Sequence, residues 1–272
     1  MISFTKAHAC GNDFLIVRQD AAAEGERASL TRRLCARHSG IGADGVEFFA
    51  WTGPASGRIR LHNADGSVAE ISGNGTRCVA AWMAEALGCQ AGDKLLIGTD
   101  AGVRECRVDR VCRESGFMAE ITTAMGVPSF VPHTLRLVDG TEIVGVEVST
   151  GNPHFVIVVE DERFLAAERG WESLGAEIFA HRDFPGQTNV EFVHVVSENA
   201  IAIRIFERGV GPTHSSGTGS AAAATAVLAL HGCTSPLAVA APGGAQTVAW
   251  SGPGTELYLT GPAALIARGE AY

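Results

Sequence analysis

Short apolar or alternating segments recur along most of the chain, and they predict β-strands. Examples are "FLIV" from Phe14, "RIRLHN" from Arg58 and "IAIRIF" from Ile201, which are β-branched, aromatic or alternating in character. Later pieces such as "KLLIG" and "ELYLTG" are separated by glycine and proline. The pattern is typical of a chain built mainly from strands.

Two Ala-rich stretches depart from this pattern and predict long helices. They cover residues 75–87 and 219–230, and neither contains proline or an internal glycine. The first ends at Gly88 and the second just before Gly232, which are good helix-ending signals. Each helix is entered through a Ser-Gly-x-Gly turn, "SGNG" or "SGTG".

The two helices belong to a repeat that covers both halves of the chain. "RIRLHN" aligns with "AIRIFE" from Ala202, and "VEF" occurs at Val46 and again at Val190. Near the start of each half, "CGNDFLIV" parallels "TGNPHFVIV". Because these landmarks and the two turns keep the same order, we interpret the chain as a duplicated unit.

The repeat predicts an α+β fold with two pseudo-symmetric lobes and a cleft between them. Each lobe is expected to wrap mostly antiparallel strands around its long central helix. We place the N-terminal lobe at residues 1–124 and the C-terminal lobe at residues 125–262. The tail, residues 263–272, is expected to return to the N-terminal lobe.

Composition narrows the class of protein. The 272 residues are 46% hydrophobic and carry a net charge of -9 without a basic stripe, so neither nucleic acid nor an anionic membrane is an expected partner. No 18-residue apolar run or signal-peptide pattern occurs, and the expected location is cytoplasmic. Seven cysteines form no CxxC pair and are expected to be reduced core thiols, not a zinc site or a disulfide framework.

The Ser-Gly-x-Gly turns are candidate anion sites. A helix N-terminus presents unpaired N–H groups at the positive end of its dipole, and two such ends could hold one carboxylate. The alternative is that Ser72 and Ser216 are only helix caps and that the glycines only permit tight turns. Duplication at the same register favours a binding role, which would include the turn residues Gly73, Asn74, Gly217 and Thr218.

Other polar residues at strand ends and turns are candidates for ligand binding. Asparagine can bind ammonium and carboxylate groups, although it also suits left-handed turns. Glu207 occupies the repeat position of Asn63, which favours a ligand role over a surface pair with Arg208. His154 is either a buried, satisfied histidine or a site residue, and Asp44 and Asp65 are interpreted as turn formers. The asparagines are Asn12, Asn63, Asn74, Asn152 and Asn189.

The motifs together resemble the diaminopimelate epimerase family over nearly the whole chain. They are "KAHACGNDF", "GIGADGVEF", "NADGS", "SGNGTRC", "GNPH", "TNVEF", "ERGVG", "SGTGS" and "LYLTGPA". The resemblance implies two lobes around a substrate cleft, a homodimer, and conversion of LL- to meso-diaminopimelate in lysine and cell-wall precursor synthesis. It implies no organic cofactor or metal, because the α-proton is exchanged by two protein groups.

The resemblance also implies roles for particular residues. The two helix N-termini would bind the α-carboxylate and stabilise the carbanion. The distal amino-acid end of the substrate would meet Asn63, Asn189, Glu207 and Arg208, with Asn12 and Asn152 nearby. Arg208 would be a bidentate clamp for the distal carboxylate.

The sequence departs from the family at both proton-transfer positions, where the family has cysteine and this chain has Ser72 and Ser216. An alcohol is a much weaker acid than a thiol, so an unassisted serine pair should be a poor racemase. Three explanations remain open. The serines could be engineered substitutions, or they could belong to a serine branch that recruits His154 or Glu207 as a base. The chain could also catalyse a different carbanion reaction, such as dehydration, isomerisation or epimerisation of another amino acid. A catalytically silent amino-acid-binding relative is the alternative function.

Overall fold

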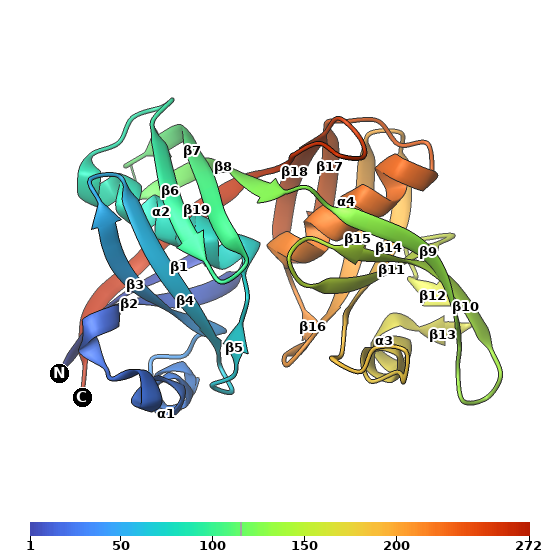
Figure 1. Ribbon diagram of the computed structural model, residues 1–272, viewed down its shortest axis with the longest axis horizontal. Coiled ribbons are helices and arrows are strands. Elements are labelled where there is room, and N and C mark those ends of the chain that lie inside the picture. Colours follow the sequence, from blue (N-terminus) through green and yellow to red (C-terminus); the bar gives the residue numbers. More distant parts are fainter. Residues whose placement is uncertain (115) are drawn as a thin grey trace. The chain divides into compact units, whose positions relative to one another are not determined.

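The computed structural model describes residues 1–114 and 116–272, and the chain divides into two compact units (Figure 1). Unit 1 comprises Met1–Ala124 and Thr260–Tyr272, and unit 2 comprises Met125–Leu259. The sequence placed the start of the returning tail at residue 263, and the structural boundary lies at Thr260. Within the described residues, no helix has the length and apolar character that a membrane crossing requires.

Unit 1 contains nine strands, two α-helices and a short 3-10 helix among its described residues. The strands are β1 (Ile2–Ala9), β2 (Asn12–Arg18), β3 (Gly45–Gly53), β4 (Ser56–Asn63), β5 (Val68–Ala69), β6 (Lys94–Thr99), β7 (Gly102–Cys112), β8 (Met118–Gly126) and β19 (Leu257–Ala271). The helices are η1 (Gln19–Ala21), α1 (Glu24–Cys35) and α2 (Gly73–Leu87).

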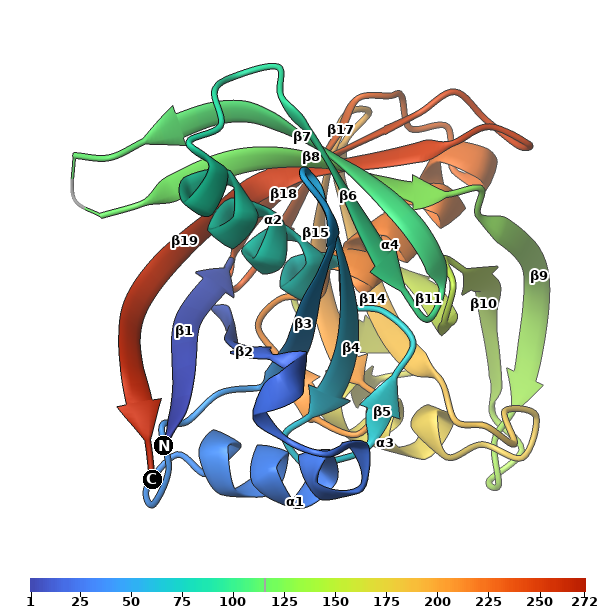
Figure 2. The same ribbon diagram turned by 60° about the vertical axis from the view of Figure 1, so that its left-hand side comes forward.

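The sheet of unit 1 surrounds helix α2. Strand pairing follows a closed circuit, β1–β2–β3–β4–β6–β7–β8–β19 and back to β1, with β2–β3 and β4–β6 parallel. The pairing of β1 with β19 brings Ile2 opposite Ala271, so the two chain ends lie side by side (Figure 2). Eight strands around one helix explain why α2 is rich in small residues, because apolar side chains face it from all directions.

Unit 2 contains ten strands and two α-helices. The strands are β9 (Ser129–Arg136), β10 (Glu142–Ser149), β11 (Pro153–Val159), β12 (Leu165–Ala166), β13 (Arg169–Gly170), β14 (Asn189–Ser197), β15 (Ala200–Glu207), β16 (Gly211–Thr213), β17 (Leu237–Ala241) and β18 (Gly244–Trp250). The helices are α3 (Trp171–Phe179) and α4 (Gly217–Leu230).

Unit 2 repeats the architecture of unit 1. Helix α4 packs against β10, β11, β14, β15, β17 and β18, and residues 221–224 of the helix are fully buried alanines. The parallel pairs β11–β14 and β15–β17 correspond to β2–β3 and β4–β6 of unit 1. The predicted α+β fold, with a long helix wrapped by mostly antiparallel strands in each half, is confirmed.

Close packing of the sheet predicts a contrast between two glycines of unit 1. A methyl group on Gly57 would lie 2.2 Å from Cε2 of the fully buried Phe49 ring, whereas one on the exposed Gly25 would have nothing within 4 Å. We expect Gly57→Ala to lower the free energy of unfolding by about 1–3 kcal/mol. Gly25→Ala, in a helix, should raise it by about 0.5–1 kcal/mol. Urea unfolding of both variants tests this, and equal effects would contradict it.

Candidate active site

The two Ser-Gly-x-Gly turns have the same geometry. Ser72 precedes α2 in an extended conformation, and its Oγ accepts a hydrogen bond from the Gly75 N–H at 3.0 Å. Ser216 precedes α4 in the same way, and its Oγ accepts from the Gly219 N–H at 3.2 Å. Both serines are N-caps, and each stands at a helix end whose partial positive charge attracts anions.

Two asparagines lie together beside the turn of unit 1. Asn74 Nδ2 donates to Asn12 Oδ1 at 3.2 Å, and Asn12 Nδ2 donates to Asp44 Oδ2 at 2.7 Å. The fully buried Arg77 donates to Asn74 Oδ1. Asp44, which the sequence indicated only as a turn former, is thus also the acceptor that orients Asn12.

Charged residues hold the start of β2 in place. Asp13 accepts from the Arg37 guanidinium at 2.9 Å and pairs with the Lys6 ammonium at 2.9 Å, while Arg37 also reaches Asp44 at 2.7 Å. Burial raises the pKa of Asp13, but hydrogen bonds from Arg37 and Lys6 outweigh it and leave the pKa below its usual value. Asp13 therefore stays ionised at neutral pH as a structural anion.

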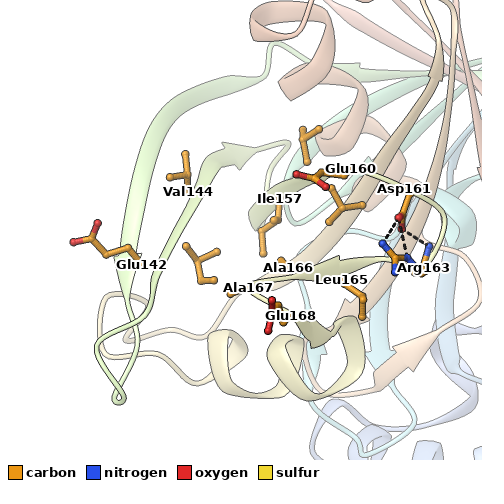
Figure 3. A pocket seen from close by; sticks show the side chains of 13 residues that line it. Glu142, Val144, Ile157, Glu160, Asp161, Arg163, Leu165, Ala166, Ala167 and Glu168 are labelled. Atoms are coloured by element: carbon orange, nitrogen blue, oxygen red, sulfur yellow. Dashed lines mark hydrogen bonds and ion pairs between the residues drawn. The ribbon is translucent and has the colours of Figure 1, made fainter.

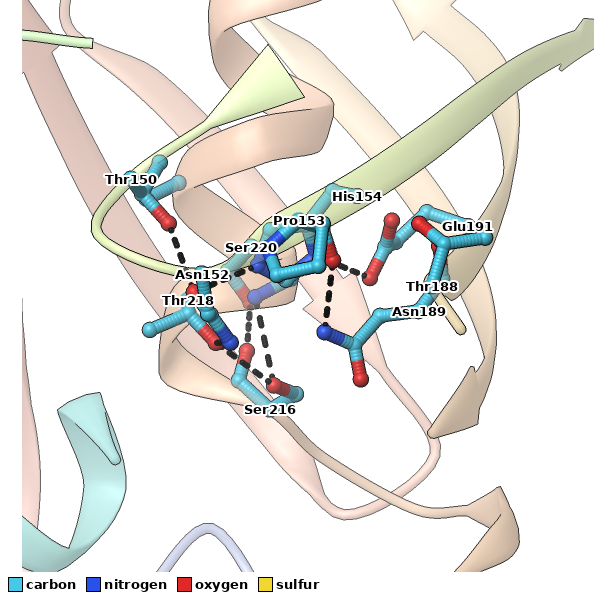
Figure 4. A network of polar contacts seen from close by, with 12 residues as sticks. Thr150, Asn152, Pro153, His154, Thr188, Asn189, Glu191, Ser216, Thr218 and Ser220 are labelled. Atoms are coloured by element: carbon cyan, nitrogen blue, oxygen red, sulfur yellow. Dashed lines mark hydrogen bonds and ion pairs between the residues drawn. The ribbon is translucent and has the colours of Figure 1, made fainter. Parts of the chain in front are cut away.

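In unit 2, hydrogen bonds connect the serine to a buried histidine (Figure 4). The Ser216 hydroxyl lies 3.4 Å from Thr218 Oγ1, which accepts from Asn152 Nδ2 at 3.4 Å. Asn152 Oδ1 in turn lies 2.9 Å from His154 Nε2, and His154 Nδ1 lies 2.8 Å from Glu191 Oε1. Both ring nitrogens of His154 are therefore occupied, and its connection to Ser216 is indirect.

The remaining candidates divide between the two units. Asn189 donates to the Pro153 carbonyl at 2.8 Å and accepts from the Arg208 N–H at 2.9 Å, so it fixes the segment that follows Glu207. Asn63, in unit 1, instead donates to Ser67 Oγ at 3.1 Å. Gly73 and Gly217 are the first residues of α2 and α4.

Two buried glutamates at the turns were not among the candidates. Glu47 and Glu191, the acidic residues of the two "VEF" motifs, are fully buried. A Cβ on Gly75 would lie 2.1 Å from Glu47 Oε1, and a Cβ on Gly219 would lie 2.7 Å from Glu191 Oε1. The signal in the sequence was a charged residue repeated at the same register inside an apolar strand.

Burial raises the pKa of both glutamates. It raises the pKa of Glu47 to about 8, and no neighbouring charge opposes it. Burial also raises the pKa of Glu191, although His154 partly offsets the effect. Both carboxyl groups therefore hold protons more strongly than an exposed glutamate.

A hollow elsewhere in unit 2 does not involve the turn. It has a volume of about 730 Å³ and lies between the ends of β10 and β11 and the segment around β12 (Figure 3). Its polar lining includes Glu142, Glu160 and an Asp161–Arg163 ion pair. None of the serine-turn residues lines it.

Comparison with known proteins identifies the family. The protein-family model described as diaminopimelate epimerase matches residues 4–131 and 146–266 of this chain. The diaminopimelate epimerase of Thermosynechococcus vestitus is 37% identical, and the match covers 98% of each chain. The diaminopimelate epimerase of Pseudomonas savastanoi is 34% identical, and the match covers 99% of each chain. That of Moorella thermoacetica is also 34% identical, and the match covers 98% of each chain.

Solved structures with low sequence identity share the fold. A hydroxyproline epimerase from Agrobacterium vitis, with bound trans-4-hydroxy-L-proline, has a TM-score of 0.73 at 16% identity and covers 99% of this chain and 90% of its own. A methylitaconate-delta-isomerase has a TM-score of 0.64 at 15% identity, covering 98% and 94%. The fold is therefore that of racemases, epimerases and related isomerases. Within this class, the chain belongs to the diaminopimelate epimerase family, a family of isomerases.

Burial of Glu47 predicts how stability depends on pH. The pKa of this carboxyl group is 4.5 in the unfolded chain and about 8 in the folded one. The folded state therefore binds the proton more tightly, and the free energy of unfolding falls as the pH rises from 4.5 to 8. We expect Glu47→Gln to exceed the wild type in free energy of unfolding by roughly 2–4 kcal/mol at pH 8 and to match it near pH 4.5. Urea unfolding at both pH values tests this.

The exposed Glu105 provides the control. It forms a surface pair with Lys94 at 2.9 Å, and Glu105→Gln should change stability by less than about 1 kcal/mol at either pH. A Glu47→Gln curve that runs parallel to the wild-type curve would show that Glu47 ionises freely in the fold.

Proposed function

We propose that the chain interconverts LL- and meso-diaminopimelate by two-base proton transfer at the α-carbon, as a step of lysine biosynthesis. Ser72 and Ser216 are the two proton-transfer positions. The observation that carries the proposal is the occurrence of the same serine-capped turn at the same place in both units. Membership of the diaminopimelate epimerase family supports the choice of substrate.

In this proposal the turns bind the α-carboxylate. The backbone of Gly73 and Asn74 in one turn, and of Gly217 and Thr218 in the other, stabilises the negative charge that develops when the α-proton leaves. No organic cofactor or metal takes part, because the helix ends and the proton-transfer groups supply the chemistry.

The distal amino-acid end of the substrate is assigned to the polar residues at the strand ends. Arg208 binds the distal carboxylate, and its segment is supported by the hydrogen bond from its N–H to Asn189. Glu207, Asn63 and Asn189 complete the set, with Asn12 and Asn152 nearby. The proposal includes a homodimer in the cytoplasm.

The hydroxyl groups of Ser72 and Ser216 favour a second candidate function, which is binding of the amino acid without reaction. Each serine oxygen already accepts a backbone N–H, and an isolated hydroxyl group is a far weaker acid than a thiol. A relative that binds diaminopimelate without reaction is consistent with these caps. A divergent enzyme that carries out dehydration, or epimerises another amino acid, is a further alternative.

Solvent exchange at the α-carbon separates these functions. We expect the wild-type protein, incubated with LL-diaminopimelate in D2O, to replace the α-proton slowly but measurably above a protein-free control. Proton NMR follows the loss of the α-proton signal. Binding without exchange would favour the silent relative, and absence of both binding and exchange would exclude diaminopimelate as the ligand.

Restoring thiols should accelerate the reaction. A thiolate is accessible near neutral pH and its pKa falls at a helix N-terminus, so Ser72→Cys combined with Ser216→Cys should raise the epimerisation rate by about 10²-fold or more. The rate is measured by chiral separation of the LL and meso forms. A flat response would mean that the site is built for a different reaction.

Substrate binding should depend on Arg208. Arg208→Ala removes a charge-assisted pair and should weaken diaminopimelate binding by roughly 1.5–3 kcal/mol, measured by titration calorimetry. The control is Arg163→Ala, since Arg163 is exposed and pairs with Asp161 at the hollow described above. Equal affinities of both variants would remove Arg208 from the binding site.

A further inference from the structure

The Glu47 carboxyl group is buried in an apolar layer. Its strand neighbours at the same level are Ile16 on β2 and Leu61 on β4. The residue has no exposed surface, and neither carboxyl oxygen has a hydrogen-bond partner in the described part of the chain. Because an unpaired buried carboxyl group destabilises a fold, its presence calls for an explanation.

Glu47 and Ser72 both lie next to Gly75. The position of a Cβ on Gly75 is 2.1 Å from Glu47 Oε1 and 3.2 Å from the Ser72 Cβ. The Ser72 oxygen accepts the Gly75 N–H, which leaves its own hydroxyl hydrogen free to point toward another acceptor. The carboxyl group and the serine thus both border Gly75 at the start of α2.

Unit 2 repeats this arrangement with one difference. A Cβ on Gly219 would be 2.7 Å from Glu191 Oε1 and 3.3 Å from Ser216 Oγ. Glu191 is held by His154, however, whereas Glu47 has no such partner among the described residues. Both copies of the turn keep a carboxyl group at the same place, which indicates that the group serves the turn and not the local packing alone.

We propose that the Glu47 carboxyl group exchanges a proton with the Ser72 hydroxyl, an inference that rests on the proposed function and extends it. No hydrogen bond joins the two groups in this structure, so the exchange requires the carboxyl group to turn toward Oγ. Glu47 acts through Ser72 and does not touch the substrate, which makes it a positioning residue.

The exchange is balanced in both directions. When the substrate Cα–H bond breaks, its proton moves to Ser72 Oγ, the serine proton moves to a Glu47 carboxylate oxygen, and the electron pair stays on the α-carbon. In the reverse direction, the carboxyl proton of Glu47 replaces the proton that Ser72 delivers to the α-carbon. The serine therefore transfers protons without becoming a free alkoxide.

The acidity of Glu47 suits this task. Burial raises its pKa to about 8, close to the value of about 8.5 for an ordinary thiol. An ionisable side chain near it on α2 is the Cys78 thiol, whose pKa is also raised by burial. A serine backed by this carboxyl group approaches the basicity that the family obtains from cysteine.

Four proteins test the inference: the wild type, Glu47→Gln, the Ser72→Cys/Ser216→Cys double variant, and the triple variant. The readout is α-proton exchange of LL-diaminopimelate in D2O. We expect Glu47→Gln to slow exchange by about 10²-fold in the serine background. It should leave the cysteine background nearly unchanged, because a thiol needs no carboxyl partner. A similar loss in both backgrounds would indicate a merely structural role and overturn the inference.

The same set separates this inference from the proposed function. Exchange at equal rates by the wild type and Glu47→Gln would overturn the role of Glu47 while the proposed function stands. Absence of exchange in all four proteins, including the cysteine pair, would instead count against the proposed function. A second experiment tests the proton exchange between Glu47 and Ser72 without substrate.

The substrate-free test is a pH titration of isotope-labelled glutamate carboxyl groups by NMR, with the Glu47 signal assigned from its loss in Glu47→Gln. We expect Ser72→Ala to shift the midpoint of the Glu47 titration, because the hydroxyl group that exchanges protons with it is gone. Ser216→Ala, the same change in unit 2, should leave the midpoint unchanged. Identical midpoints in the wild type and Ser72→Ala would overturn the inference.

Discussion

Each serine-capped turn depends on the absence of a side chain at its fourth residue. A buried glutamate oxygen occupies the space that a Cβ on Gly75 or Gly219 would need, so glycine is required there by a close approach and not by backbone conformation. The turn can then present its first helical N–H groups on one side and keep a carboxyl group on the other. A larger residue would push these two features apart in both units.

The two units use the same plan but distribute polar partners differently. In unit 2 the carboxyl group belongs to a continuous set of hydrogen bonds that reaches Ser216 through His154, Asn152 and Thr218. In unit 1 the corresponding carboxyl group and two nitrogens of the buried Arg77 lack hydrogen-bond partners among the described residues. The two units therefore share the backbone geometry of the turn more closely than they share the hydrogen-bond partners of the buried carboxyl group.

The sequence was sufficient to predict the fold, while the site residues that it indicated stay predictions. Repeated landmarks and helix-ending glycines predicted both long helices, which begin two residues earlier than expected because the serines cap them directly. The sequence also picked out Asn12, Asn74, Asn152 and His154, which the structure joins by hydrogen bonds within each unit. It missed Glu47, because periodicity shows that a position faces the core but not that the facing helix has left room for a carboxyl group.

The buried cysteines have a consequence for the behaviour of the protein toward oxidants. All seven are free thiols, and burial raises the pKa of five: Cys35, Cys78, Cys89, Cys106 and Cys233. Peroxides and alkylating reagents attack thiolates, which these five scarcely form at neutral pH. Ser72 and Ser216 carry hydroxyl groups and no sulfur. Oxidants that would inactivate a pair of cysteines at these positions therefore leave the two turns unchanged.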